Sequence, residues 1–210
     1  PFGEDARIDM DELDALVRDA VRAMDNVVDV SRFPLAEQER EAKGKRRIGL
    51  GVTGLADALI LCRTRYGSPA SLALIDTWMK AISRSAYLAS ADLAREKGAF
   101  PLFDRDEYLK GETIAALDAD VREAIAKHGI RNALLTSIAP TGTISLFAGN
   151  VSSGIEPVFA FNYTRNVLMP DGTRREERVT DYAIDKFYEK FGEGAALPDY
   201  VAQATCAGPC

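Results

Sequence analysis

The sequence predicts a helix-rich α/β fold that forms one unit. Segments in which apolar residues recur every three or four positions alternate with short apolar segments of strand length, as in helices packed with strands. No linker rich in Pro, Gly or Ser divides the chain. With 210 residues, of which 47% are hydrophobic and 28% charged, the composition is that of a globular chain with a substantial core and excludes a disordered one.

Four helices are predicted in the first half of the chain, from apolar spacing and from capping residues at their ends. They cover Asp9–Asp29, Pro34–Glu41, Leu55–Cys62 and Pro69–Lys97. The last of these begins after the capping residue Ser68 and stops at Gly98. Trp78 and Tyr87 widen its apolar stripe, which favours burial against a sheet over a coiled coil.

Shorter elements are predicted in the second half of the chain. Helices are expected over Asp104–Lys110, Asp118–Lys127, Thr143–Ala148 and Thr180–Phe191, and strands over Ala133–Ile138, which is expected to be buried, and Phe159–Leu168. Met169–Gly172 has the composition of a tight turn, and Gly192 ends the last helix. The stretch from Asn132 to Ile155 carries no charge but many hydroxyls, which predicts buried backbone and directs the search for a site there.

The charge balance excludes two classes of partner. A net charge of −6 and a pI of about 5.0 provide no general attraction for nucleic acid or for an acidic membrane surface. The one basic cluster, within residues 43–47, lies beside Glu39 and Glu41 and is expected in a solvated helix end or linker. With no signal-peptide pattern and no apolar run long enough to span a bilayer, we expect a cytoplasmic protein.

The cysteines and the histidine give little chemistry. Three cysteines exclude a disulfide-rich scaffold, and a single histidine argues against zinc, so no metal site is predicted. Cys62 lies in an apolar stretch and is expected in the core. Cys206 and Cys210 form a C-x3-C pair, for which a redox shuttle, half a metal site and an ordinary tail stay open, the last being favoured.

Gly49–Gly54 matches the GxGxxG pattern of dinucleotide-binding folds. That pattern needs a preceding strand and an acidic residue about twenty positions later. Only Arg46–Ile48 precede the first glycine, Asp57 comes too early, and Asp76 falls inside the long helix. A closely packed glycine-rich strand or turn is therefore favoured over a nicotinamide site.

A stronger signal lies at Ala139–Ser145, where an apolar strand leads through a loop into a helix. The first N–H groups of a helix lack internal acceptors and lie at the positive end of its dipole. Gly142 would let an anion approach the backbone, while Thr141, Thr143 and Ser145 add hydroxyl donors. From the residues alone, a phosphate cradle and an ordinary capped helix both stay open.

Glu156 stands alone as a charge beside this uncharged stretch. It could pair with Arg165, hold substrate hydroxyls or lie exposed, and the structural pair is favoured. No nucleophile and base are found together, because the single histidine, His128, lies at a predicted helix end where capping explains it. No catalytic residue is predicted.

Four motifs, in this order, resemble the C-terminal half of the ribonucleotide reductase catalytic barrel. They are Arg47–Asp57 (RIGLGVTGLAD), Gly98–Pro101 (GAFP), Ser137–Ser145 (SIAPTGTIS) and Ser153–Pro157 (SGIEP). The APTGTIS version is similar to the adenosylcobalamin-dependent class II enzymes rather than to the iron-dependent class I enzymes. The match extends to about Ala204.

The resemblance implies a fold and a site. The fold would be part of a ten-stranded α/β barrel, with Gly49–Gly54 as a barrel strand and its exit. The substrate, a ribonucleoside diphosphate or triphosphate, would be held at its phosphates by one segment, with Glu156 near the same pocket. That segment comprises Ala139, Pro140, Thr141, Gly142, Thr143, Ile144 and Ser145. The parent enzyme would use adenosylcobalamin, a thioredoxin-type reductant and the rest of the barrel.

The resemblance also implies what lies elsewhere. In the family, the radical-forming cysteine, its partners and the redox cysteine pair precede the matched segment. We therefore expect a fragment, with residues 1–204 as barrel and 205–210 as a tail. It is expected to bind no cobalamin and to be inactive alone. Because a cut barrel exposes strand edges, we also expect the fragment to self-associate or to have a disordered C-terminal segment. The alternative function is a nucleotide-binding or assembly module without catalysis.

Overall fold

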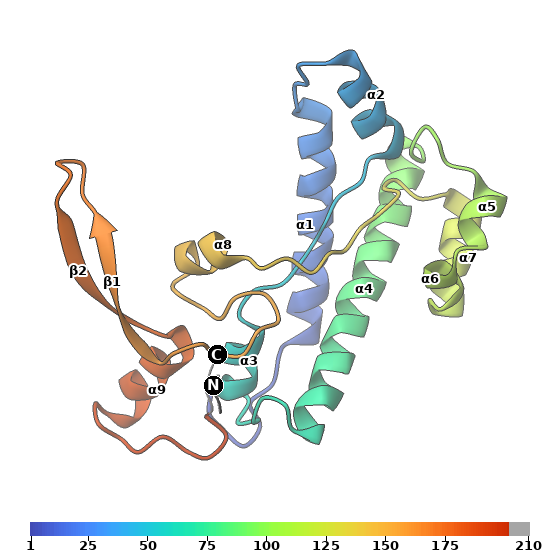
Figure 1. The fold of residues 1–210 in the computed structure, drawn as a ribbon. Coiled ribbons are helices and arrows are strands. Elements are labelled where there is room, and N and C mark those ends of the chain that lie inside the picture. The colour runs from blue at the N-terminus through green and yellow to red at the C-terminus, as the bar shows by residue number, and fades with distance from the viewer. Residues whose placement is uncertain (202–210) are drawn as a thin grey trace. The chain divides into compact units, whose positions relative to one another are not determined.

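The computed structural model describes residues 1–201, and its contacts divide the chain into two compact units (Figure 1). Unit 1 comprises residues 1–8, 51–75 and 138 onward, and unit 2 comprises residues 9–50 and 76–137. The units interleave along the chain, so a sequence without an internal linker does not predict this division. Cys206, Cys210 and the 205–210 tail lie outside the described residues.

Unit 2 is helical. Its helices are α1 (Met10–Val30), α2 (Ala36–Lys45), most of α4 (Pro69–Lys97), α5 (Arg105–Leu109), α6 (Glu112–Ala115) and α7 (Ala119–His128). The predicted helices are confirmed except that α6 was not expected and that α2 extends beyond its expected end at Glu41 to Lys45. One apolar core joins these helices except α2, and it is centred on fully buried Val21, Val121, Ile125 and Ile130.

The ends of the two long helices follow from their capping residues. The carboxylate of Asp9 accepts hydrogen bonds from the N–H groups of Asp11 and Glu12 at 3.0 and 3.1 Å, which starts α1. Ser68 accepts from the N–H of Ser71 at 3.1 Å at the start of α4, and Gly98 ends that helix with a φ of +87°.

Helix α4 packs against α1 rather than against a sheet, which corrects the sequence-based expectation. Ion pairs join the two helices, from Arg18 to Asp92 at 3.2 Å and from Arg22 to Glu96 at 2.7 Å. Trp78 and Tyr87 are buried as expected, at 5% and 6% exposure.

The predicted buried strand at 133–138 is a short stretch of parallel pairing instead. The N–H of Ile48 donates to the carbonyl of Leu134 at 3.0 Å, and the N–H of Ser137 donates to that of Leu50 at 2.9 Å. Only one bridge, Leu50 to Thr136, has strand geometry, and Leu134 is 56% exposed. The glycine-rich segment does pack closely, since a Cβ on Gly49 would lie 2.8 Å from the Ser137 hydroxyl.

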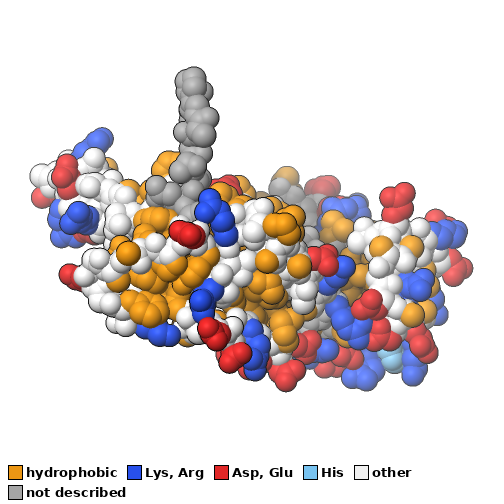
Figure 2. All heavy atoms as spheres, turned by 90° about the horizontal axis from the view of Figure 1, so that it is seen from below, with side chains coloured by type: hydrophobic (Ala, Val, Ile, Leu, Met, Phe, Trp, Pro, Cys, Tyr) orange, Lys and Arg blue, Asp and Glu red, His pale blue; other side chains and the backbone are white. Residues whose placement is uncertain are grey.

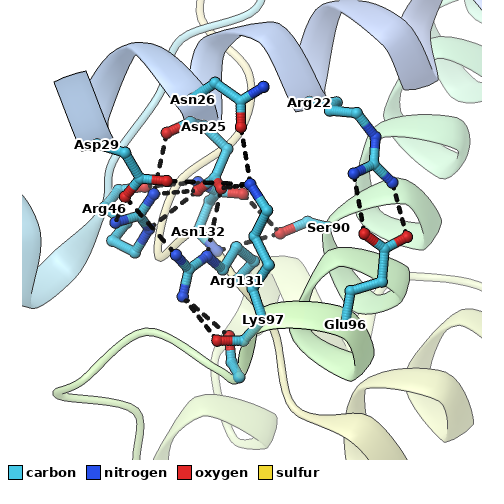
Figure 3. Close-up of polar contacts among 11 residues, drawn as sticks. Arg22, Asp25, Asn26, Asp29, Arg46, Ser90, Glu96, Lys97, Arg131 and Asn132 are labelled. Carbon is cyan, nitrogen blue, oxygen red and sulfur yellow. Dashed lines mark hydrogen bonds and ion pairs between the residues drawn. The ribbon is translucent and has the colours of Figure 1, made fainter.

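A buried polar network holds these two segments to α1 (Figure 3). Asp25 is fully buried, and its Oδ1 accepts from the Arg46 guanidinium at 2.7 Å and from the Asn132 amide at 3.0 Å. Arg131 and Lys97 reach its Oδ2 at 3.3 and 3.4 Å. Arg46 is only 4% exposed, so the expectation that the whole basic cluster is solvated is wrong at this residue.

The network sets the charge state of Asp25. Burial by itself would raise the pKa of this carboxyl, but hydrogen bonding and attraction from Arg46 outweigh burial, and with Arg131 they hold the pKa below its ordinary value. Because the folded pKa is lowered, the stabilisation is present above the unfolded pKa and is lost as the pH falls through the folded one.

Unit 1 contains α3 (Leu55–Leu61), α8 (Gly142–Phe147), α9 (Tyr182–Phe191) and an antiparallel hairpin of β1 (Asn162–Leu168) and β2 (Arg174–Thr180). Strand β2 was not predicted. Asp181 caps α9 by accepting from the N–H groups of Ala183 and Ile184, so this helix begins two residues after its expected start at Thr180. Phe2, Ile60 and Phe187 lie in its core.

The helix-rich character is confirmed for residues 1–201. Within them the strands form one two-stranded sheet and one isolated bridge, so the expected half of a ten-stranded barrel is not seen. Cys62 is half-buried rather than fully in the core. In this part of the chain no helix is both long and apolar enough to cross a bilayer.

We predict that Asp25→Ala lowers the free energy of unfolding of unit 2 by about 3–5 kcal/mol, because it removes the buried acceptor of the Arg46 guanidinium and leaves that buried cation with only the partly exposed carboxylate of Asp29, at 2.8 Å. Urea unfolding followed by the fluorescence of Trp78 measures the loss. Asp19→Ala, at an exposed position of the same helix, is the control and is expected to change stability little. The difference in the free energy of unfolding between wild type and Asp25→Ala should shrink below about pH 4. Equal stability of the wild type and both variants at neutral pH would contradict the prediction.

Candidate phosphate-binding site

A cavity of about 420 Å³ in unit 1 collects most of the polar groups singled out from the sequence. Its lining comes from α8, from the loop that follows it, from β1 and from the start of α9. The polar lining residues are Thr143, Ser145, Asn150, Ser152, Ser153, Glu156, Tyr163, Arg165 and Asp181. The cavity therefore has one cationic side chain and two carboxyl groups.

Helix α8 begins with donors that have no acceptor. Thr141 takes the left-handed conformation, with a φ of +51°. The first helical hydrogen bond runs from the N–H of Ser145 to the carbonyl of Thr141 at 2.7 Å. The N–H groups of Gly142, Thr143 and Ile144 donate to no group among residues 1–201. Three free donors in succession at a helix start form the kind of backbone site that accepts an anion.

Two of the three predicted hydroxyl donors serve the loop instead. The Thr141 hydroxyl accepts from the N–H of Gly154 at 2.6 Å and donates to the Thr53 hydroxyl at 3.1 Å. Ser145 is buried and donates to the carbonyl of Gly142 at 2.8 Å. Thr143 is exposed and makes no hydrogen bond through its side chain within the described residues, which leaves its hydroxyl open to a ligand.

The predicted ion pair between Glu156 and Arg165 is not formed, although both residues line the cavity. Among the described residues, neither is within 4.0 Å of an opposite charge. The Arg165 guanidinium instead lies 5.7 Å from the centre of the Tyr163 ring and donates to its hydroxyl at 3.3 Å. That hydroxyl donates to Asn150 at 2.7 Å. Arg165 is thus an unneutralised cation facing the cavity.

Sequence reasoning missed two buried acids at the cavity: Asp181 lines it, and Asp57 accepts from the N–H of the lining residue Ser152. Asp57 and Asp181 are 2% and 3% exposed. Burial and then the charge of Asp57 raise the pKa of Asp181 to about 8. The only sequence signal was that Asp57 sits in the first turn of a helix right after the glycine-rich segment.

The structure divides the predicted site residues into two groups. Gly142, Thr143, Ser145 and Glu156 line the cavity. Ala139, Pro140, Thr141 and Ile144 belong to the same segment but lie outside the lining. No metal-holding group of His, Cys, Asp or Glu side chains occurs in residues 1–201, and burial raises the pKa of the Cys62 thiol.

Comparison with known proteins identifies the family. Residues 2–190 match the family described as ribonucleotide reductase, barrel domain. The chain belongs to this family. The resemblance inferred from the four motifs is thereby confirmed, and the matched region includes the whole candidate site.

Individual members of the ribonucleotide reductase family agree with this assignment. The chain is 41% identical over 165 residues to the vitamin B12-dependent ribonucleoside-diphosphate reductase of Mycobacterium tuberculosis, covering 78% of this chain and 21% of that protein. It is 39% identical to the vitamin B12-dependent enzyme of Thermoplasma acidophilum, over 77% of this chain and 19% of that one. The alpha subunit of the Treponema pallidum reductase is 33% identical over 76% of the chain. The chain spans about a fifth of the length of these relatives.

We predict that Gly154→Ala destabilises unit 1 by about 1–3 kcal/mol, since Gly154 has a φ of +47° and an added Cβ would lie 2.6 Å from the carbonyl oxygen of Ala139. Hydrogen exchange of the α9 amides measures the change. Gly142→Ala is the matched control, because its Cβ would meet nothing within 4 Å. Equal exchange in both variants would contradict the prediction.

Proposed function

We propose that this chain supplies the substrate phosphate-binding segment of a ribonucleoside-diphosphate reductase, which converts ribonucleotides to deoxyribonucleotides by thiyl radical chemistry. The observation that carries the proposal is the row of free N–H groups at Gly142, Thr143 and Ile144 beside the cavity. The family membership and the names of the relatives supply the reaction class.

The role of the segment is positioning. A phosphate group carries several acceptor oxygens, and backbone N–H groups fixed by a helix start bind them without reorganisation. Holding the phosphates anchors the nucleotide, so that the ribose presents one face to the groups that react with it. The substrate is a ribonucleoside diphosphate or triphosphate; Glu156 lies at the cavity wall, within the region where substrate hydroxyls would be held.

The cofactor of the whole enzyme is adenosylcobalamin, which supplies the radical when bound. Two relatives are named as vitamin B12-dependent, which supports this cofactor. Among residues 1–201, His128 ends α7, and the Cys62 thiol is half-buried with a raised pKa. In our proposal, this chain makes no cobalamin contact and performs no radical step, and the reductant, of the thioredoxin type, acts on other parts of the enzyme.

The rest of the barrel is the structural partner. In our proposal the parallel segments at 48–50 and 134–137 are neighbouring barrel strands, which their hydrogen bonds support. Apolar side chains near the candidate site are open to solvent, including Ile138 at 66%, Phe147 at 94% and Phe159 at 85% exposure. Apolar atoms lie open on the molecular face in Figure 2 as well. Large apolar side chains exposed to this degree support a surface that another part of the protein covers.

Calorimetry with a ribonucleoside diphosphate tests the phosphate site. We expect weak binding that Gly142→Asp abolishes, because a carboxylate at the helix start repels phosphate. Gly3→Asp is the control, since it adds the same charge at an exposed glycine with nothing within 4 Å. The bound chain should show no reductase turnover. Binding that survives Gly142→Asp, or turnover by the purified chain, would sink the proposal.

We also predict that the isolated chain self-associates through its exposed apolar side chains. Sedimentation velocity of the wild type should show dimers or larger species at micromolar concentration, and Phe147→Ser with Phe159→Ser should shift the chain toward monomer. Leu16→Ser, at an exposed position of α1, is the control. A wild-type chain that sediments as a monomer would contradict the prediction.

A further inference from the structure

Asp57 and Asp181 form a buried acidic pair that the proposed phosphate binding does not use. Asp57 lies in the first turn of α3 and Asp181 caps α9, and both are almost completely buried. No Lys, Arg or His of residues 1–201 lies within 4.0 Å of either carboxyl. A buried carboxylate without a cation is destabilised by several kcal/mol unless hydrogen bonds or a proton compensate.

The hydrogen bonds of the pair connect three segments of unit 1. The Asp57 carboxylate accepts from the N–H of Ser152 at 2.5 Å and from the N–H of Ala183 at 3.0 Å. Asp181 accepts from the same Ala183 N–H at 3.1 Å and from the N–H of Ile184 at 3.3 Å. Both carboxyl groups therefore place an oxygen against the same N–H group, that of Ala183. Two ionised carboxylates that share one donor and have no cation beside them repel each other, which favours a proton on one of them.

We propose that Asp57 and Asp181 share one proton at neutral pH and that the protonated pair is a positioning device for the wall of the phosphate cavity. The proton is a property of the fold alone. The effect on the cavity rests on the proposed function, and the experiments below separate the two.

Ser152 is the residue through which the pair acts on the cavity. Its N–H is held by Asp57, and its hydroxyl accepts from the N–H of Ala56 at 3.1 Å. Its carbonyl accepts from the N–H of Gly54 at 2.7 Å. Two residues later, the N–H of Gly154 donates to the Thr141 hydroxyl at the start of α8. Loss of the shared proton would place two like charges in contact and push α9 away from α3, which loosens Ser152 and the segment that leads to α8.

The groups around the pair offer no competing titration partner. Glu156, Tyr163 and Arg165 line the same cavity, Tyr182 and Asp185 follow on α9, and Arg178 lies near the end of β2; none hydrogen-bonds to either carboxyl. Burial and the charge of Asp57 raise the pKa of Asp181 from 3.8 to about 8. The folded state therefore holds its proton more tightly than the unfolded chain, so this group's contribution to stability is present below about pH 4 and is lost as the pH rises toward 8.

Carboxyl-carbon NMR of the 210-residue chain tests the shared proton directly. With aspartate labelled at the side-chain carbon, Asp57→Asn and Asp181→Asn assign the two signals. At about pH 7 we expect one protonated carboxyl in the pair, against an ordinary aspartate that is ionised above about pH 5. Two ionised carboxylates at about pH 6 would overturn the proposal, whether or not the chain binds phosphate.

Asp181→Asn keeps the shape of the pair without the titration, because an amide can still accept from Ala183 and donate to Asp57. We expect the melting temperature of the wild type to fall between about pH 5 and pH 8 relative to that of Asp181→Asn. Asp185→Asn, on the same helix, should follow the wild type. Parallel pH profiles of the wild type and Asp181→Asn would overturn the shared proton.

Binding of a ribonucleoside diphosphate tests the positioning role. We expect wild-type affinity to weaken severalfold, relative to Asp181→Asn, when the pH is raised from about 6.5 to 8.5. Equal pH dependence of the two proteins would overturn the positioning role while leaving the shared proton intact. If neither protein binds at either pH, the proposed function and the positioning role both fail. The NMR titration then still shows whether the two carboxyl groups share a proton.

Discussion

A buried carboxylate that accepts hydrogen bonds from distant segments organises each of the two units. In unit 2, Asp25 joins α1 to the segments that begin at Arg46 and Asn132. In unit 1, Asp57 joins α3 to Ser152 and to the start of α9. Each fixes backbone segments that lie far apart in the sequence. They are compensated differently: Asp25 by cations, and Asp57 by N–H groups and, in our proposal, by a shared proton.

This constraint explains how an exposed segment can carry an ordered site. The residues from 138 to 156 bury few apolar side chains, and their backbone is held by hydroxyl and carboxyl acceptors instead. The hydrogen bonds that link Thr53, Thr141 and Gly154 occupy the Thr141 hydroxyl, which the sequence suggested as a donor to a ligand. What remains for a ligand is backbone N–H, the Thr143 hydroxyl and the guanidinium of Arg165. A site of this composition recognises negative charge and the geometry of several oxygens rather than a particular base.

The sequence predicts those parts of the fold that depend on local periodicity and capping. Helices α1 and α4 have regular apolar spacing and clear caps, and both are present. Strand β2 was missed because RREERVT has no apolar alternation, and it forms only because β1 pairs with it. Arg46 was expected to be solvated because a run of charges does not reveal the buried acid, Asp25, that pairs with it from 21 residues away. For the same reason the pair of Asp57 and Asp181 was invisible, since it exists only once α3 and α9 meet.

The charge state of that pair bears on the cavity in a further way. With Glu156 ionised, a doubly ionised pair would set three negative charges against one guanidinium around a site proposed to hold a phosphate. Inside a protein such charges act on one another more strongly than in water, so an anion would be repelled. A shared proton removes one of these charges without removing the acceptor that holds Ser152. Burial thus keeps one of the two acids protonated, and this lowers the negative charge beside a cavity proposed to hold phosphate. Both proposals therefore depend on the charge of this buried pair.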